Sequence, residues 1–187
     1  MLDNKKIEES SKVMQQLIKS GKIIKPGPKT KDFFLSKGRK SLIVAKRLLE
    51  LQEEENIDAN LWVINASYYS MFFDATALLA HYNHKIKSNV GIHKITYHAL
   101  VYYFVKLDNK LKKEIVEGYD EAIRDAEELL QLGENRIKDL ITSFDNEMSK
   151  RKDFTYEIEL DIEKNKAITS FKRAQKFHEE ISKVIVK

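Results

Sequence analysis

The stretch that decides the fold is Leu61–His81, which reads LWVINASYYSMFFDATALLAH. Apolar residues lie at nearly every angle around a helix of this sequence, which is typical of a helix buried on most sides. The longest uncharged run covers residues 59–73 and is shorter than the ~18 residues that a membrane span needs. We therefore predict a central buried helix and no membrane-spanning segment.

The composition favours further helices around this one. The chain has 187 residues with only 6 Gly and 2 Pro, which argues against a many-stranded sheet with tight turns. Charged residues make up 33% and hydrophobic residues 42%, a mixture suited to amphipathic helices. The absence of Cys excludes disulfides, thiolate metal sites and cysteine nucleophiles. A net charge of +4 permits contact with nucleic acid without predicting it.

Several flanking segments have helical spacing of their apolar residues. They are Lys5–Ser20, a helix from about Asp32, Ile92–Lys106, a helix after Asp108 and Asn109 whose stripe continues past Gly133, and a last helix over Asp161–Val184. The segment Phe154–Ile162 instead alternates apolar and polar residues, and we expect an extended strap lying on the bundle. The predicted fold is all-α: an antiparallel bundle of four or five helices with a short N-terminal helical extension.

The clearest linker is Gly21–Thr30, because it holds both prolines. We therefore predict two parts, an N-terminal helix with its linker over residues 1–30 and the bundle over residues 31–187. The N-terminus lacks the apolar region of a signal peptide, so we expect a cytoplasmic protein that does not associate with membranes.

Four histidines lie in two pairs, His81 with His84 and His93 with His98. A zinc site needs a third supported ligand, and the chain has no His-Glu-x-x-His motif. We interpret these residues as ordinary surface or helix-end histidines, and expect no metal and no cofactor.

A polar stripe runs along the central helix. Ser67, Ser70, Asp74 and His81 fall within about 60° of one another on a helical projection. The favoured interpretation is that the stripe is the strip where this helix contacts solvent. The alternative is that it lines a cleft, where Asp74 orients a cation from another helix.

A basic cluster, Lys150, Arg151 and Lys152, precedes Tyr156. A guanidinium can bind phosphate through two hydrogen bonds, lysines add attraction, and a tyrosine hydroxyl can bind the same group. The alternative is a solvated cluster that complements the dipole at a helix end.

Taken in order, several segments resemble the HEPN family of small helical-bundle proteins, in the branch with a short N-terminal helix. The segments are Leu17–Ile23, Ala66–Phe72, His93–Lys94 (with Ile92 in place of the family's serine), Arg151 with Tyr156, and then Ala167, Ala174 and Phe177. The resemblance implies a bundle that often forms a homodimer and brings two arginine motifs together in a cleft. Active members resemble metal-independent ribonucleases built on Arg-x(4–6)-His, and many are encoded with a minimal nucleotidyltransferase in toxin–antitoxin-type pairs.

This sequence departs from the nuclease motif at its proton-transfer position. Tyr156 stands where the motif has His, and Thr155 stands where this branch usually has Asp. A tyrosine hydroxyl has an ordinary pKa of about 10, against about 6.5 for histidine, and acid–base catalysis favours a pKa near the working pH. We therefore expect weak or no nuclease activity.

The resulting prediction is a protein that binds RNA or nucleotide phosphate and works with a nucleotidyltransferase partner. The binding residues expected are Arg151, Lys150, Lys152, Ser67 and Ser70, and the catalytic candidates are Arg151, Tyr156 and Asp74. One alternative is an active endoribonuclease toxin in which Tyr156 or Asp74 replaces the usual base. Another is a non-catalytic protein-interaction module. Tyr156 is also a candidate acceptor for nucleotides that the partner would transfer.

Overall fold

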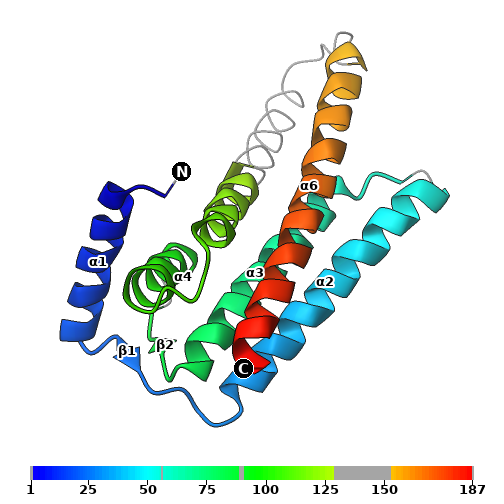
Figure 1. Ribbon diagram of the computed structural model, residues 1–187. Helices are drawn as coiled ribbons and strands as arrows, with labels where there is room; N and C mark the ends of the chain where they lie inside the picture. The colour runs from blue at the N-terminus through cyan, green and yellow to red at the C-terminus, as the bar shows by residue number, and fades with distance from the viewer. Residues whose placement is uncertain (1, 56, 89–90, 129–152, 187) are drawn as a thin grey trace, which may run out of the picture.

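The computed structural model describes residues 2–55, 57–88, 91–128 and 153–186, with the backbone alone over residues 153–163. The helices are α1 (Asn4–Lys19), α2 (Thr30–Glu55), α3 (Asn60–His81), α4 (Ile92–Leu100), the π-helix η1 (Val101–Leu107), an unlabelled helix over residues 113–128, and α6 (Asp153–Val186). Two short strands, β1 (Ile23–Ile24) and β2 (Lys85–Ile86), complete the described elements (Figure 1). The predicted all-α class is confirmed.

Helix α3 lies at the centre of the bundle, as its apolar sequence predicted. Thirteen of its 22 residues are buried. Helix α2 runs antiparallel to it, since Gln52 near the end of α2 donates a hydrogen bond to Asn60 at the start of α3. Helix α6 runs in the same direction as α3, and Figure 1 shows these three helices side by side. None of the helices in the described ranges is long and apolar enough to cross a membrane.

Helix α1 packs against α4 and η1, and the side chain of Met14 is 0% exposed. Gly21 follows the end of this helix, and its φ of +66° is a left-handed conformation that favours glycine. The Lys22 amide donates to the Leu17 carbonyl at 2.9 Å and the Gly21 amide donates to the Ile18 carbonyl, which together form a Schellman cap.

The predicted linker contains strand β1, and strand β2 lies between α3 and α4. The strands pair antiparallel, with Ile23 opposite Ile86 and Ile24 opposite Lys85. A strand of two residues is too short to show a period-two pattern, so no pattern in the sequence indicated this pairing. Residues 1–30 therefore meet the rest of the chain at two places, while their division from residues 31–187 stays a prediction.

The predicted strap over Phe154–Ile162 is wrong, because these residues form the first turns of α6, which begins at Asp153 rather than Asp161. The same alternation places Phe154, Ile158 and Ile162 at i, i+4 and i+8, which is also one stripe of a helix.

The helix predicted after Asp108 and Asn109 is present over residues 113–128, and its apolar stripe is buried. Seven apolar residues on or just before this helix are each at most 4% exposed, namely Leu111, Ile115, Val116, Tyr119, Ala122, Ile123 and Ala126. The rest of that predicted stripe, including Gly133, lies outside the described residues.

Candidate functional site

The polar stripe of α3 is buried, and its interpretation as a strip of solvent contact is wrong. Ser67, Ser70 and Asp74 are each 0% exposed. Helices α2 and α6 both pack on this side of α3 and exclude water from it. His81, at the end of α3, is only partly buried.

Asp74 forms a hydrogen bond with the imidazole of a residue on another helix. Its Oδ2 atom lies 2.9 Å from Nδ1 of His178, which is in the last third of α6. A carboxylate only accepts hydrogen bonds, so His178 donates through Nδ1. This leaves Nε2 of His178 as the nitrogen that can exchange a proton.

Gly38 of α2 lies directly against this carboxylate. A Cβ atom at position 38 would be 2.1 Å from Oδ1 of Asp74 and 3.2 Å from the carbonyl oxygen of Ser70. The Ser70 hydroxyl donates to the Gly38 carbonyl at 2.8 Å, which fixes α2 against α3 at this point. No described residue gives Oδ1 of Asp74 a hydrogen bond.

The surroundings shift the proton affinities of both partners. Burial raises the pKa of Asp74, and the hydrogen bond from His178 only partly opposes this effect. The hydrogen bond to Asp74 raises the pKa of His178, while burial and the charge of Arg39 lower it. The side chain of His178 is 19% exposed, and its Nε2 has no hydrogen-bond partner among the described residues. The arrangement is therefore an imidazole fixed on its inner side and accessible on its outer side.

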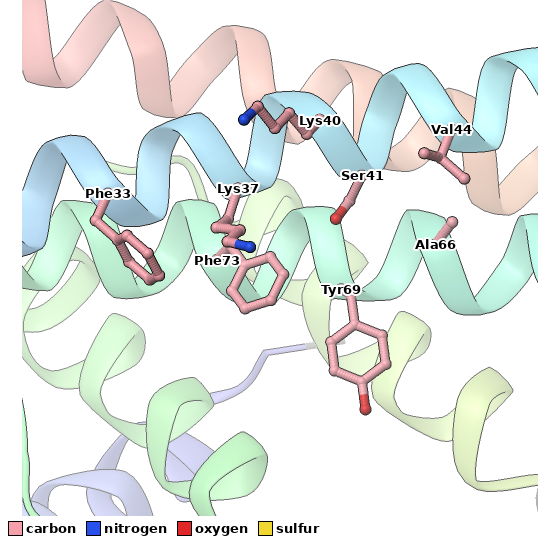
Figure 2. A pocket seen from close by; sticks show the side chains of 8 residues that line it. All are labelled: Phe33, Lys37, Lys40, Ser41, Val44, Ala66, Tyr69 and Phe73. Carbon is pink, nitrogen blue, oxygen red and sulfur yellow. The ribbon is translucent and has the colours of Figure 1, made fainter.

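A groove of about 440 Å³ lies between α2 and α3, in addition to the Asp74–His178 pair. Figure 2 shows its lining, which is Phe33, Lys37, Lys40, Ser41 and Val44 from α2 with Ala66, Tyr69 and Phe73 from α3. None of these lining residues is acidic. Tyr69 is 45% exposed and Phe33 is 55% exposed, so the groove presents aromatic faces to solvent.

The two lysines of this groove are available to a ligand. Lys37 Nζ lies 5.6 Å from the centre of the Phe33 ring. Within the described part of the chain, no carboxylate lies within 4.0 Å of Lys37 or Lys40. The groove therefore combines positive charge with aromatic surface.

The sequence did not single out this groove, although a signal was present. On α2, Phe33, Lys37, Ser41 and Val44 are spaced by four, four and three, and Tyr69 and Phe73 of α3 are four apart. Two such stripes on antiparallel neighbours face one side of the helix pair. Their pairing depends on which helices are neighbours, and only the structure shows that.

The structure separates the other predicted site residues. Lys150, Arg151 and Lys152 lie outside the described residues. Tyr156 is in the first turn of α6, 22 positions before His178, so the two are about 33 Å apart along the helix axis. Because His178 pairs with Asp74, Tyr156 and Asp74 of one chain lie in different regions of the bundle. Ser67 and Ser70 are 0% exposed, so they cannot contact a phosphate in solvent. The Arg151–Tyr156 site stays a prediction.

Three of the paired histidines have partners inside the fold. His98 Nδ1 is 2.9 Å from the Ser10 hydroxyl, His84 stacks on Tyr103, and the His93 ring is 4.3 Å from that of Phe72. In the described ranges, no three His, Cys, Asp or Glu side chains lie where they could hold a metal ion.

Comparison of the chain with known protein families, with curated proteins and with solved structures finds no match in any of the three. The resemblance to the HEPN family therefore remains an expectation from the sequence.

Proposed function

We propose that the protein is a HEPN-type helical bundle that binds single-stranded RNA and works with a minimal nucleotidyltransferase in the cytoplasm. The observation that supports RNA binding is the groove between α2 and α3, where Lys37 and Lys40 lie beside exposed aromatic rings.

The chemistry of this groove suits single-stranded RNA. Proteins that bind single strands without strict sequence preference stack bases on aromatic side chains and neutralise phosphates with basic residues. Tyr69 and Phe33 offer the stacking surface, and Lys37 and Lys40 the positive charge. A groove without acidic lining does not repel the phosphates.

The partners follow from the resemblance. A homodimer would bring two basic clusters around Arg151 together, and these clusters would add phosphate contacts to those of the groove. Because Tyr156 occupies the proton-transfer position, the basic cluster around Arg151 binds RNA rather than cleaving it. Tyr156 is also the proposed acceptor if the partner transfers nucleotides, and the intact mass of the protein after co-expression would show the added nucleotide.

RNA binding is tested by fluorescence anisotropy with a labelled single-stranded RNA over a series of salt concentrations. Removing both groove lysines, in Lys37→Ala with Lys40→Ala, should weaken binding and reduce the log–log salt slope by about 1.4, because each phosphate contact contributes about 0.7. The matched control is Lys12→Ala with Lys19→Ala, which removes the same charge from exposed positions of α1. Equal losses in the two double variants, or no RNA binding by the wild type, would refute this function.

A protein-interaction module is the second candidate, because α2 and α3 also carry exposed apolar side chains. Trp62 is 64% exposed and Ile43 is 58% exposed, and neither residue lines the groove. Large exposed apolar patches mark interaction sites. If Trp62→Ser changes the oligomeric state in analytical ultracentrifugation and leaves RNA affinity unchanged, this patch serves a protein partner and is separate from the RNA groove.

A further inference from the structure

The Asp74–His178 pair lies at the contact of α2, α3 and α6, outside the RNA groove. We propose that His178 is a proton-transfer residue for RNA cleavage, that Asp74 is its positioning residue, and that Arg39 binds the reacting phosphate. This proposal takes its substrate class from the proposed function and assigns the cleavage to a site other than Arg151 and Tyr156.

The first step of the argument is the orientation of the imidazole. Asp74 Oδ2 accepts the Nδ1 hydrogen of His178 at 2.9 Å, so a neutral ring carries its lone pair on Nε2. Nε2 has no hydrogen-bond partner among the described residues, and the His178 side chain is partly exposed. A carboxylate that fixes one ring nitrogen while the other faces the substrate is the arrangement of an acid–base histidine.

The second step is that the pair is a poor arrangement if its role is packing alone. Asp74 is 0% exposed, and its Oδ1 has no hydrogen bond from any described residue. A buried carboxylate oxygen without a partner is unfavourable, and apolar residues of similar volume commonly stabilise such a position better. A local arrangement that is unfavourable for stability is typical of functional sites.

The third step is the nearby guanidinium. Arg39 is exposed, and in the part of the chain that the structure describes no carboxylate lies within 4.0 Å of it. Its charge is close enough to His178 to lower the pKa of that imidazole, whereas the neighbouring Glu179 raises it. A free guanidinium binds phosphate through two hydrogen bonds and can stabilise the charge of a pentacoordinate phosphorane.

The site can be reached by a strand that leaves the groove. Lys40 lines the groove and Arg39 precedes it on α2, and consecutive residues of a helix are about 100° apart around its axis. In the view of Figure 2, α6 lies behind α2 while the groove faces the reader. A single strand that leaves the groove over Lys40 therefore comes next to Arg39, the preceding residue of α2.

The reaction needs no oxidant or reductant. Nε2 of His178 takes the proton of a ribose 2′-hydroxyl, and the 2′-oxygen attacks the adjacent phosphorus. The bond from phosphorus to the 5′-oxygen breaks, and this oxygen takes a proton from water. His178 then returns its proton to solvent. The products are a 2′,3′-cyclic phosphate and a 5′-hydroxyl. Asp74 does not touch the RNA, since it has no exposed surface.

Cleavage is measured in EDTA with the full-length protein and two probes, a labelled single-stranded RNA and the dinucleoside monophosphate UpA, which does not depend on the groove. We expect 2′,3′-cyclic products, with kcat/KM lowered at least ~100-fold in His178→Gln, as is usual when an acid–base group is removed. Arg39→Ala should lower it at least ~10-fold. The matched controls, His81→Gln and Arg124→Ala, are expected to keep the wild-type rate.

The role of Asp74 is read from the pH profile, which a purely structural residue would not shift. His178 acts as a base when neutral, so the rate rises with pH through its pKa. Without the carboxylate, Asp74→Asn should have a lower His178 pKa, and the acid limb of the profile should move to lower pH. NMR titration of His178 gives the same pKa without substrate, and thermal melting shows whether the variant is folded.

The outcomes separate this proposal from RNA binding. If both probes stay intact, or if His178→Gln cleaves at the wild-type rate, the proposal is overturned, whether or not RNA binds the groove. If UpA is cleaved in a His178-dependent way but the long RNA does not bind, the cleavage site stands and the groove loses its assigned ligand.

Discussion

Asp74 is a carboxylate without access to water, so the few groups around it determine its charge state. Gly38 provides the space for its Oδ1, and His178 provides the hydrogen bond to its Oδ2. Burial raises the pKa of Asp74, and the hydrogen bond to Asp74 raises that of His178. Both shifts mean that the folded state holds protons more tightly than the unfolded state does.

The free energy of unfolding should therefore fall as the pH is raised above 6.5. The folded-state pKa of His178 lies above its ordinary value of 6.5, so its stabilisation is complete below pH 6.5 and is lost as the pH rises through the folded value. Urea denaturation over a pH series measures this slope, and His178→Gln should reduce it, because the contribution of the imidazole is lost.

Three other histidines do not contribute to the pH dependence of the free energy of unfolding above pH 6.5. Burial lowers the pKa values of His84, His93 and His98, so they affect stability only below pH 6.5 and with the opposite slope. His84→Gln is the matched control and should keep the wild-type slope above pH 6.5. An unchanged slope in His178→Gln would show that this pair does not couple protonation to folding.

At the scale of the elements, α2 approaches α3 closely at Gly38, a residue without a side chain. A glycine in a helix interior is about 1 kcal/mol less favourable than alanine. Gly38 is inside α2, where a Cβ atom would be 2.1 Å from Oδ1 of Asp74. The close approach of the two helices therefore explains its presence.

Gly38→Ala should destabilise the protein by about 2 kcal/mol or more, because overpacking at this contact outweighs the gain in helix propensity. Gly118→Ala is the matched control. The added Cβ would be 3.2 Å from Cγ of Arg173, so relief there needs a shift of only a few tenths of an ångström. Chemical denaturation measures both variants, and equal stabilities would contradict the role of Gly38.

Elements were predicted correctly where the spacing of apolar residues fitted only one kind of secondary structure. Residues 61–81 have apolar side chains at nearly every angle, and α3 is indeed central. The pattern over Phe154–Ile162 had two interpretations, and the helical one is correct because α6 continues through it. The π-helix η1 had no signal, since its residues fit an ordinary α-helix equally well.

The candidate site was harder to predict, because it depends on contacts between distant residues. Spacing alone grouped Ser67, Ser70 and Asp74, but it could not show that α2 and α6 cover them. His178 is 104 positions from Asp74 in the sequence. Only the packing of α6 on α3 brings them together.

At the scale of the whole molecule, the packing of α1 on the bundle determines whether the chain unfolds as one unit or two. Met14 belongs to the same buried cluster as Leu78 and Phe104. Lys106 Nζ also contacts Glu8 Oε1 at 2.9 Å, which joins η1 to α1. These contacts favour one cooperative unit despite the linker over residues 21–30.

Met14→Ala should therefore lower the global free energy of unfolding by about 2–4 kcal/mol, because it leaves a cavity in a shared core. Ile18→Ala, at an exposed position of α1, is the control and should change it little. Denaturation followed by circular dichroism and by the fluorescence of Trp62 measures the effect. If Met14→Ala changes only part of the transition seen by circular dichroism and leaves the transition seen by Trp62 fluorescence unchanged, α1 unfolds independently of the bundle. The predicted division at residue 30 would then be right.

The docking of α1 has a consequence for synthesis on the ribosome. Its partner Lys106 emerges 98 positions after Glu8. At translation rates of about 5–20 residues per second, this interval lasts about 5–20 s. During that time the apolar side of the nascent α1 has no native surface to cover it. The first helix to be made is thus among the last to be secured, and it is the segment most open to chaperones while the chain is being completed.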